Sequence, residues 1–159
     1  MCLTLEEIKN VLKQRERYYD GTYRTHIVQA YIERPLLYHK RKFDLRHYVM
    51  ITCINGILKG YWYKEGYVRT TACEYSLSNS SGAIHLTNDA VQKNLPEYGK
   101  YEKGNKLSYD ELNNYIEKYH KKKGKGFYDT IYKKMKHVAT DAIRACSGGI
   151  DPSKLANNF

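Results

Sequence analysis

The residues best suited to chemistry in this sequence are three charged side chains that alternate along one stretch, Lys42, Asp44 and Arg46. Successive side chains of a β-strand point to opposite faces, so these three would share one face of a strand. Cations in this arrangement suit phosphate and carboxylate groups, and Asp44 suits a ribose hydroxyl or a metal-bound phosphate. The same pattern also fits a solvated strand face with salt bridges between neighbouring strands.

Further polar residues stand elsewhere in the chain. Arg69 lies on a later expected strand and would reach the face of Asp44 from two strands away. Gln29 interrupts an apolar run whose backbone N–H and C=O groups would suit an adenine ring, although the pattern alone favours a core strand with one hydrogen-bonded glutamine. After a loop that contains glycine come three small polar side chains, of which the histidine is as a rule structural: His85, Thr87 and Asn88.

Capping and alternation patterns predict the elements that would hold these residues. Thr4 and Glu7 form the signature of a capping box, which opens a helix over residues 5–17. The apolar run 26–32 predicts a buried strand, and an Asn-Gly dipeptide predicts a hairpin turn within a three-stranded antiparallel meander over 42–73. The other expected elements are a second turn at 64–66, a short strand over 83–88, and helices over 108–122 and 127–147.

The order of helix, strands and helices favours an α+β fold over alternating βαβ units. With 159 residues, the chain has the length of one domain. We expect Gly148 and Gly149 to end the last helix. The apolar faces of the two late helices exceed what the meander can cover, so we expect the chain to be part of a larger domain.

Charge and composition narrow the class of partner. The formal net charge of +10 favours an acidic partner such as a nucleotide, a nucleic acid or an acidic polypeptide. The lysine-rich run 121–125 is either a solvated helix end or a docking patch for an acidic chain, and the 17 tyrosines fit base stacking or ordinary packing. The absence of an 18-residue apolar run and of an apolar N-terminal signal predicts a cytosolic or nuclear protein without a membrane span. The four scattered cysteines predict free thiols.

Four motifs follow one another in a fixed order. They are Ile27-Val28-Gln29-Ala30-Tyr31-Ile32-Glu33-Arg34-Pro35-Leu36-Leu37, Arg41–Arg46, Tyr61–Arg69 and Ile84–Lys93. In order and spacing they resemble the tubulin–tyrosine ligase-like family, over roughly residues 5 to 159. The resemblance implies an ATP-grasp fold and a ligase that couples ATP hydrolysis to adding an amino acid to a protein, usually tubulin, through an acyl-phosphate. The run Asn88–Lys93 is more similar to tyrosine ligases and glycylases than to glutamylases.

The resemblance gives the first motif the role of an adenine hinge. Its residues Gln29, Ala30, Tyr31 and Ile32 would bond the base largely through their backbone. The family usually has a lysine where this chain has Ala30, so one side-chain contact would be missing.

The resemblance assigns the later motifs to the phosphates and the substrate. Lys42 and Asp44 would contact ATP phosphate and ribose or metal-linked groups. Arg46 and Arg69 would be the catalytic residues, which hold the transferred phosphate and the substrate carboxylate as negative charge develops. The nucleotide site would be completed by Thr87 and Asn88 with support from His85.

Two parts of the family pattern are not found between Met1 and Phe159. The glycine-rich loop with its lysine is expected before Met1, and the magnesium-binding Asp with a Glu-x-Asn strand is expected after Phe159. We therefore expect residues 1–159 to be a single incomplete domain, the central part of such an enzyme. ATP and Mg²⁺ are the expected cofactors, and no residue of the chain is assigned as a metal ligand.

Three functions are consistent with the residues, in decreasing order of preference. The first is the ATP-dependent ligase, which would act on tubulin C-terminal tails or another acidic protein, take a free amino acid as co-substrate, and work in the cytoplasm at the cytoskeleton or cilium. The second is a catalytically inactive module that binds tubulin or microtubules. The third is a small basic nucleic-acid-binding domain, which would bind with a steep salt dependence.

Overall fold

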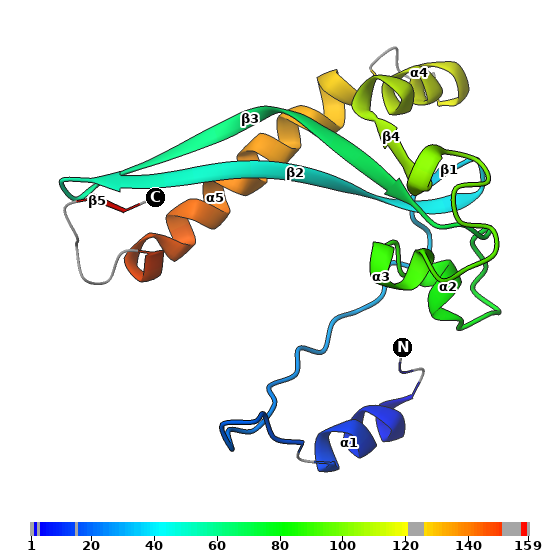
Figure 1. Cartoon of the computed structure of the whole chain (residues 1–159), viewed down its shortest axis with the longest axis horizontal. Coiled ribbons are helices and arrows are strands. Elements are labelled where there is room, and N and C mark those ends of the chain that lie inside the picture. Colours follow the sequence, from blue (N-terminus) through cyan, green and yellow to red (C-terminus); the bar gives the residue numbers. More distant parts are fainter. Residues whose placement is uncertain (1, 3, 15, 121–125, 151–156, 159) are drawn as a thin grey trace. The chain divides into compact units, whose positions relative to one another are not determined.

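The computed structural model of the chain describes residues 2, 4–14, 16–120, 126–150 and 157–158. The chain forms two compact units, Met1–Pro35 and Leu36–Phe159, and each is described by itself. Helices and an antiparallel sheet make up the second unit, which confirms the predicted α+β class (Figure 1). Within the described part of the chain, no helix is both long and apolar enough to cross a membrane.

The first unit begins with helix α1 (Leu5–Lys13), whose N-terminus is capped as predicted. The Thr4 hydroxyl accepts a hydrogen bond from the Glu7 N–H at 3.2 Å. The helix ends about one turn earlier than the predicted position 17, because the next residues form a tight antiparallel turn in which Arg17 pairs with Tyr23. Gly21 at the turn adopts a φ of 82°, a conformation that glycine takes without strain.

The strand predicted over residues 26–32 is wrong. The segment is extended but is not part of any sheet of the described residues, and its apolar side chains are largely exposed: Ile27 by 94% and Ile32 by 70%. An extended segment becomes a strand only when a neighbouring strand pairs with its backbone groups, and no described strand does so here. The apolar run therefore marks an extended segment with exposed apolar side chains and not a strand of the described sheet.

The sheet of the second unit is built around one long hairpin. Its order is β1-β2-β3-β4, all neighbours are antiparallel, and a short β5 pairs with the far end of β2 (Figure 1). The strands are β1 (Leu37–Tyr38), β2 (Arg41–Ile54), β3 (Ile57–Thr70), β4 (Lys106–Ser108) and β5 (Asn157–Asn158). The predicted Asn-Gly turn is confirmed, since Asn55 and Gly56 have φ values of 50° and 74°.

The second predicted turn, at 64–66, is wrong, because β3 continues through these residues with a bulge at 63–65. His47 pairs with Gly66 and Val49 pairs with Trp62, so a single residue of β2 opposes the three residues 63–65 of β3. Glycine in a strand often marks a bulge or a close approach of another group. The predicted meander of three strands over 42–73 is thus a two-stranded hairpin. The strand that pairs with the outer edge of β3 is β4, which lies much later in the chain.

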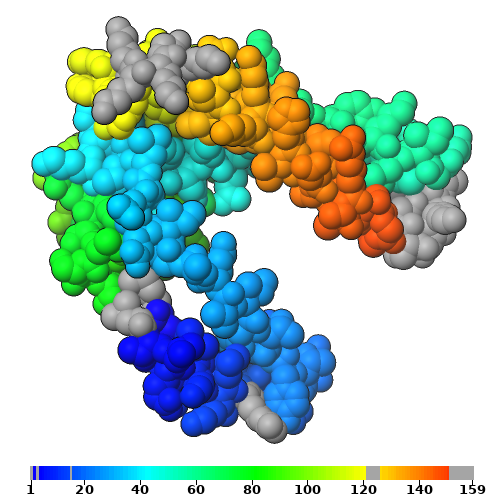
Figure 2. Space-filling view, turned by 180° about the vertical axis from the view of Figure 1, so that it is seen from behind, coloured from blue at the N-terminus to red at the C-terminus, as the bar shows by residue number. Residues whose placement is uncertain are grey.

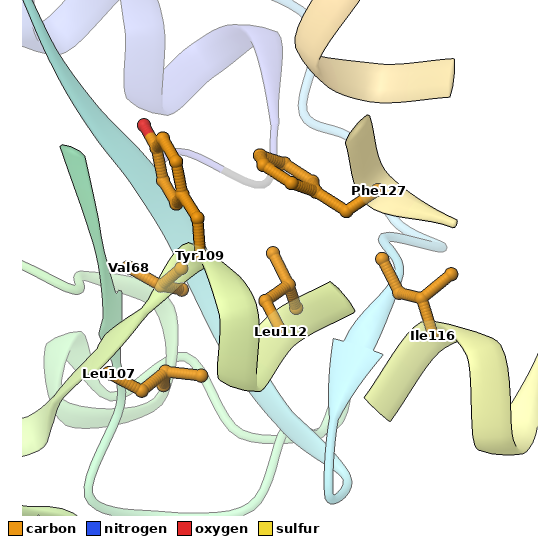
Figure 3. Close-up of a cluster of buried hydrophobic side chains, with 6 residues drawn as sticks. All are labelled: Val68, Leu107, Tyr109, Leu112, Ile116 and Phe127. Carbon is orange, nitrogen blue, oxygen red and sulfur yellow. The ribbon is translucent and has the colours of Figure 1, made fainter. Parts of the chain in front are cut away.

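Helix α4 (Tyr109–Tyr119) covers one face of this sheet. Its predicted capping box is confirmed: the Ser108 hydroxyl accepts from the Glu111 N–H at 3.2 Å, and the Glu111 carboxylate accepts from the Ser108 N–H at 2.7 Å. The helix ends at Tyr119 rather than at 122, and the lysine-rich run 121–125 lies outside the described residues. The buried core between helix and sheet comprises Val68, Leu107, Tyr109, Leu112, Ile116 and Phe127 (Figure 3).

The last helical segment begins with a π-helical turn, η2 (Tyr128–Tyr132), and continues as α5 (Lys133–Ile150). Figure 2 shows α5, in orange, running beside the hairpin towards its tip. The prediction that Gly148 and Gly149 end this helix is wrong, since the helix includes both. A glycine weakens a helix by about 1 kcal/mol but ends it only where the backbone turns to positive φ, which neither residue does.

The segment between β3 and β4 contains helices instead of the predicted strand over 83–88. It forms α2 (Gly82–His85), α3 (Asp89–Gln92) and the 3₁₀ turn η1 (Lys103–Asn105). The buried Gln92 amide holds this segment, because it accepts from the Ala72 N–H at 2.7 Å and donates to the carbonyls of Ala83 and Leu86. One side chain thereby ties α2 and α3 to the end of β3.

Candidate functional site

The centre of the candidate site is an ion pair between Asp44 on β2 and Arg69 on β3. The two residues are direct partners in the strand register, so their side chains leave the same face of the sheet. Arg69 donates from Nε to Oδ1 of Asp44 at 2.9 Å and from a terminal nitrogen to Oδ2. Arg69 was expected two strands away from Asp44; it lies on the adjacent strand because the predicted second turn does not form.

Thr87 joins this pair from the loop between α2 and α3. Its hydroxyl donates to Oδ2 of Asp44 at 2.7 Å. Burial by itself would raise the pKa of the Asp44 carboxyl, but the hydrogen bonds from Arg69 and Thr87 and the positive charges of Arg69 and Arg46 outweigh it, so the pKa is lowered. The hydrogen bond with Asp44 in turn raises the pKa of the Arg69 guanidinium. Both groups are therefore charged throughout the physiological pH range.

A second ion pair borders the first. Lys106 of β4 is the register partner of Arg69, and its ammonium lies 2.7 Å from Oδ2 of Asp89 at the start of α3. This pair was not singled out from the sequence. The signal was nevertheless present: Lys106 and Ser108 alternate with Leu107, which is buried, immediately before the capping box of α4.

Arg46 and Lys42 extend the cationic face along β2. Arg46 is exposed, is the register partner of Tyr67, and forms no ion pair with another described residue. Lys42 is half-buried, and its carbonyl accepts from the Thr71 N–H at 2.9 Å. The predicted alternation along β2 is confirmed, since Phe43 and Leu45 pack against the core on the opposite face.

His85 and Asn88 lie in the helical segment on the polar side of the sheet. His85 is buried, and its Nε2 lies 2.6 Å from the carbonyl of Asn79, in the loop before α2. Asn88 is exposed at the N-terminus of α3, and its side chain makes no capping hydrogen bond. The structure therefore brings Thr87 into contact with Asp44, and His85 and Asn88 lie in the same segment as Thr87.

The four predicted adenine-hinge residues belong to the first unit. Gln29, Ala30 and Tyr31 line a cavity of about 450 Å³ together with α1 and neighbouring residues. Ile32 follows this stretch and is exposed. The helix contributes apolar side chains that the sequence did not single out for this role, Ile8, Val11 and Leu12. A pocket lined mainly by apolar side chains suits a flat heteroaromatic ring.

The donor set on the sheet fits a polyphosphate but does not fit a metal. Two guanidinium groups, two ammonium groups and a hydroxyl are the groups that proteins use for phosphate and carboxylate recognition. Among the described residues, no cluster of three or more His, Cys, Asp or Glu side chains could hold a metal ion. The carboxylates of Asp44 and Asp89 are already engaged by cations. None of the described residues is therefore assigned to Mg²⁺.

Comparison with known proteins identifies the family. The model of the Tubulin-tyrosine ligase family matches residues 4–156. Protein monoglycylase TTLL8 of Mus musculus is 32% identical over 137 residues, covering 84% of this chain and 16% of that protein. Protein polyglycylase TTLL10 of Rattus norvegicus is 31% identical over 129 residues, which cover 79% of this chain and 19% of that protein. Tubulin glycylase 3B of Drosophila melanogaster is 36% identical over 95 residues, which cover 57% of this chain and 13% of that protein. The chain thus spans less than a fifth of the length of these relatives. With nearly all of its residues matched, the chain belongs to the tubulin-tyrosine ligase family.

Proposed function

We propose that the chain supplies the phosphate-binding sheet of an ATP-dependent ligase that adds an amino acid to a protein. The observation that carries the proposal is the cluster on the polar face of β2 and β3, where Arg69 and Thr87 both donate hydrogen bonds to Asp44 and further cations lie nearby. Cations held in a hydrogen-bonded frame are positioned before an anion arrives, so little ordering is needed on binding.

In the proposed reaction, an acceptor carboxylate oxygen attacks the γ-phosphorus of ATP, and ADP leaves. The amine of the incoming amino acid then attacks the acyl carbon, and inorganic phosphate leaves. Lys42 and Arg46 would hold the phosphate oxygens, and Arg69 would stabilise the charge that develops on the transferred phosphate or on the substrate carboxylate. Asp44 would orient Arg69 and offer its remaining acceptor capacity to a ribose hydroxyl.

The hinge residues Gln29, Ala30, Tyr31 and Ile32 would bind the adenine through their backbone, with the apolar side of α1 behind the ring. Thr87 and Asn88, supported by His85, would complete the nucleotide site. Two relatives are named as glycylases of protein and one as a tubulin glycylase, so glycine is the amino acid and tubulin the acceptor that the names favour. A tubulin C-terminal tail or a similar acidic chain would suit the net charge of +10. We place this activity in the cytoplasm, at the cytoskeleton or cilium.

Isothermal titration of the chain with ATP tests the proposal. We expect saturable binding that Lys42→Ala and Arg69→Ala each weaken at least about tenfold, because each removes a charged hydrogen-bond donor. Lys133→Ala is the matched control, since this lysine lies on α5 in an exposed ion pair with Asp129. No ATP binding, or equal affinity in all four proteins, would contradict the proposal.

A further inference from the structure

A buried tyrosine connects the hydrophobic core to the backbone of the candidate site. Tyr109, the first residue of α4, is 4% exposed and is the only member of the six-residue core cluster with a polar side-chain atom. Figure 3 shows its ring rising out of the cluster with the hydroxyl at the far end. That hydroxyl donates a hydrogen bond to the carbonyl of Arg46 at 3.0 Å. The core therefore holds the backbone of Arg46, whose side chain leaves β2 on the opposite, polar face.

The hydroxyl reaches β2 only because Gly66 has no side chain. A Cβ at this position would lie 2.5 Å from the carbonyl oxygen of Arg46, 2.6 Å from Cζ of Tyr109 and closer still to its hydroxyl. Non-bonded atoms do not approach one another this closely in proteins. Gly66 has no positive φ, so glycine is required here for space and not for backbone conformation. The bulge of β3 thus leaves a window through which Tyr109 contacts the neighbouring strand.

A histidine also contacts the Tyr109 hydroxyl. Nδ1 of His47 lies 3.2 Å from the Tyr109 hydroxyl. The hydroxyl has one hydrogen and gives it to the carbonyl of Arg46, which favours the tautomer of His47 in which Nδ1 carries the hydrogen and donates to the hydroxyl oxygen. In the neutral ring Nε2 is then an acceptor, and it is buried without a hydrogen-bond partner in the described part of the chain. Trp62 stacks on the imidazole with ring centroids 3.6 Å apart, which holds the ring in this position.

The protonation states agree with this direction. Burial raises the pKa of Tyr109 to about 12, so the phenol remains a donor at every physiological pH. Burial also lowers the pKa of His47, and it outweighs a hydrogen bond with the backbone of Tyr63, which raises the pKa. The imidazole is therefore neutral at pH 7.

We propose that Tyr109 is a positioning residue for Arg46, acting through the window at Gly66, and that His47 holds the Tyr109 hydroxyl in its donating orientation. The hydrogen bond to the Arg46 carbonyl fixes the backbone of β2 at this residue, and the Arg46 side chain extends from there onto the polar face. This inference rests on the proposed function for the anion that Arg46 would hold. The arrangement of the four residues does not depend on that function and can be tested in the free protein.

The test compares Tyr109→Phe with Tyr128→Phe. Tyr109→Phe removes the hydroxyl and keeps the ring in the core, whereas Tyr128 belongs to the same aromatic cluster but donates to Asp110 at 2.6 Å. In the free chain, NMR relaxation of the Arg46 Nε–H group measures side-chain order, and ¹⁵N shifts of His47 report its tautomer. We expect Tyr109→Phe, but not Tyr128→Phe, to lower the order of Arg46 and to populate the Nε2–H tautomer of His47. We also expect it to weaken ATP binding about five- to tenfold.

Gly66→Ala supplies a second route to the same result, since it closes the window while the hydroxyl remains. Thermal melting confirms that each variant is folded at the temperature of measurement. If Tyr109→Phe leaves Arg46 order and the His47 tautomer unchanged, Tyr109 is only a packing residue and the proposal is overturned. If the unmodified chain does not bind ATP, the proposed function fails, and the two measurements on the free chain still decide the role of Tyr109.

Discussion

The two halves of the β2–β3 hairpin consist of the same two strands and the same alternation, yet their surroundings differ. The proximal half comprises residues 41–47 and 66–70 and is flanked by β1 and β4. The distal half comprises residues 49–54 and 57–62, has α5 on one face, and pairs with β5 only at Cys53 and Ile54. The bulge at residues 63–65 separates the two halves.

Burial follows these surroundings. In the proximal half Val68 and Thr70 are 0% exposed, and the opposite face carries the Asp44 and Arg69 pair. In the distal half Met50 is 57% exposed and Ile57 is 62% exposed, although both are apolar. The alternation of a strand thus decides which side chains share a face, and the neighbouring elements decide whether that face is buried, polar or open.

The largest expected difference between the halves is in packing. Phe127 fills the core beneath the proximal half and is 0% exposed, so Phe127→Ala is expected to lower the free energy of unfolding by about 3–5 kcal/mol. The matched change in the distal half, Ile57→Ala, removes an exposed side chain and is expected to cost less than about 0.5 kcal/mol. Urea unfolding of both variants measures the difference. Similar losses in the two variants would contradict this division.

The buried ion pair at the base of the proximal half gives the next effect. Arg41 is 3% exposed and pairs with Glu102, which is 13% exposed. Arg41→Met leaves that carboxylate buried without its cation, and we expect a loss of about 3 kcal/mol. Lys40→Met is the control, because its ion pair with Glu74 spans 3.9 Å and both side chains are exposed. We expect this control to change stability by less than about 0.5 kcal/mol in the same urea titration.

Two glycines of β3 test the window at the junction of the halves. Gly66→Ala would place a methyl group against backbone and a buried ring, and we expect a loss of about 2–3 kcal/mol. In Gly60→Ala of the distal half the methyl group would meet Cδ1 of Ile143 at 2.8 Å. That atom is the end of a flexible side chain, and alanine also restricts the unfolded chain, so we expect a change within about 1 kcal/mol. Equal melting temperatures for the two variants would show that no window exists.

The smallest effect concerns the pH dependence of the polar face. The pKa of Asp44 is lowered in the folded chain, so its contribution to stability is complete above its unfolded pKa of 3.8 and is lost as the pH falls through the folded value. Because the Asp44 side chain is 35% exposed, solvent screening limits the contribution to less than about 1 kcal/mol. We expect Asp44→Asn to be less stable than the unmodified chain at pH 7 and equal to it at pH 2.

Urea midpoints at both pH values check this expectation. Asp141→Asn on α5 is the matched control, since its ion pair with Arg144 is exposed on both sides. A difference for Asp44→Asn that persists at pH 2 would show that packing rather than charge accounts for it.

The sequence predicted local features better than long-range ones. The caps at Thr4 and Ser108, the Asn-Gly turn and the sides of β2 depend on residues close together in the chain, and all are confirmed. The wrong expectations depended on contacts between distant residues. The run 26–32 pairs with no described strand, and β3 continues through 64–66, where Gly66 lies against the distant Tyr109.

The candidate site shows the same limit. Alternation placed Lys42, Asp44 and Arg46 on one face, but the register that sets Arg69 opposite Asp44 depends on how far the hairpin extends. Lys106 was missed because its role follows from the pairing of β4 with β3, some 40 residues away in the chain. Thr87 was placed near the nucleotide site by resemblance, and its contact with Asp44 follows from the folding of α2 and α3 around Gln92.

We propose that the proximal polar face binds the phosphates of a nucleotide and that the distal half does not. NMR titration of the isotope-labelled chain with ATP tests it most directly. We predict saturable shifts at the side chains of Arg46, Arg69 and Lys106, with no shift at Lys59, an exposed cation of the distal half. Shifts of equal size at Lys59, or none at the three proximal cations, would contradict the claim.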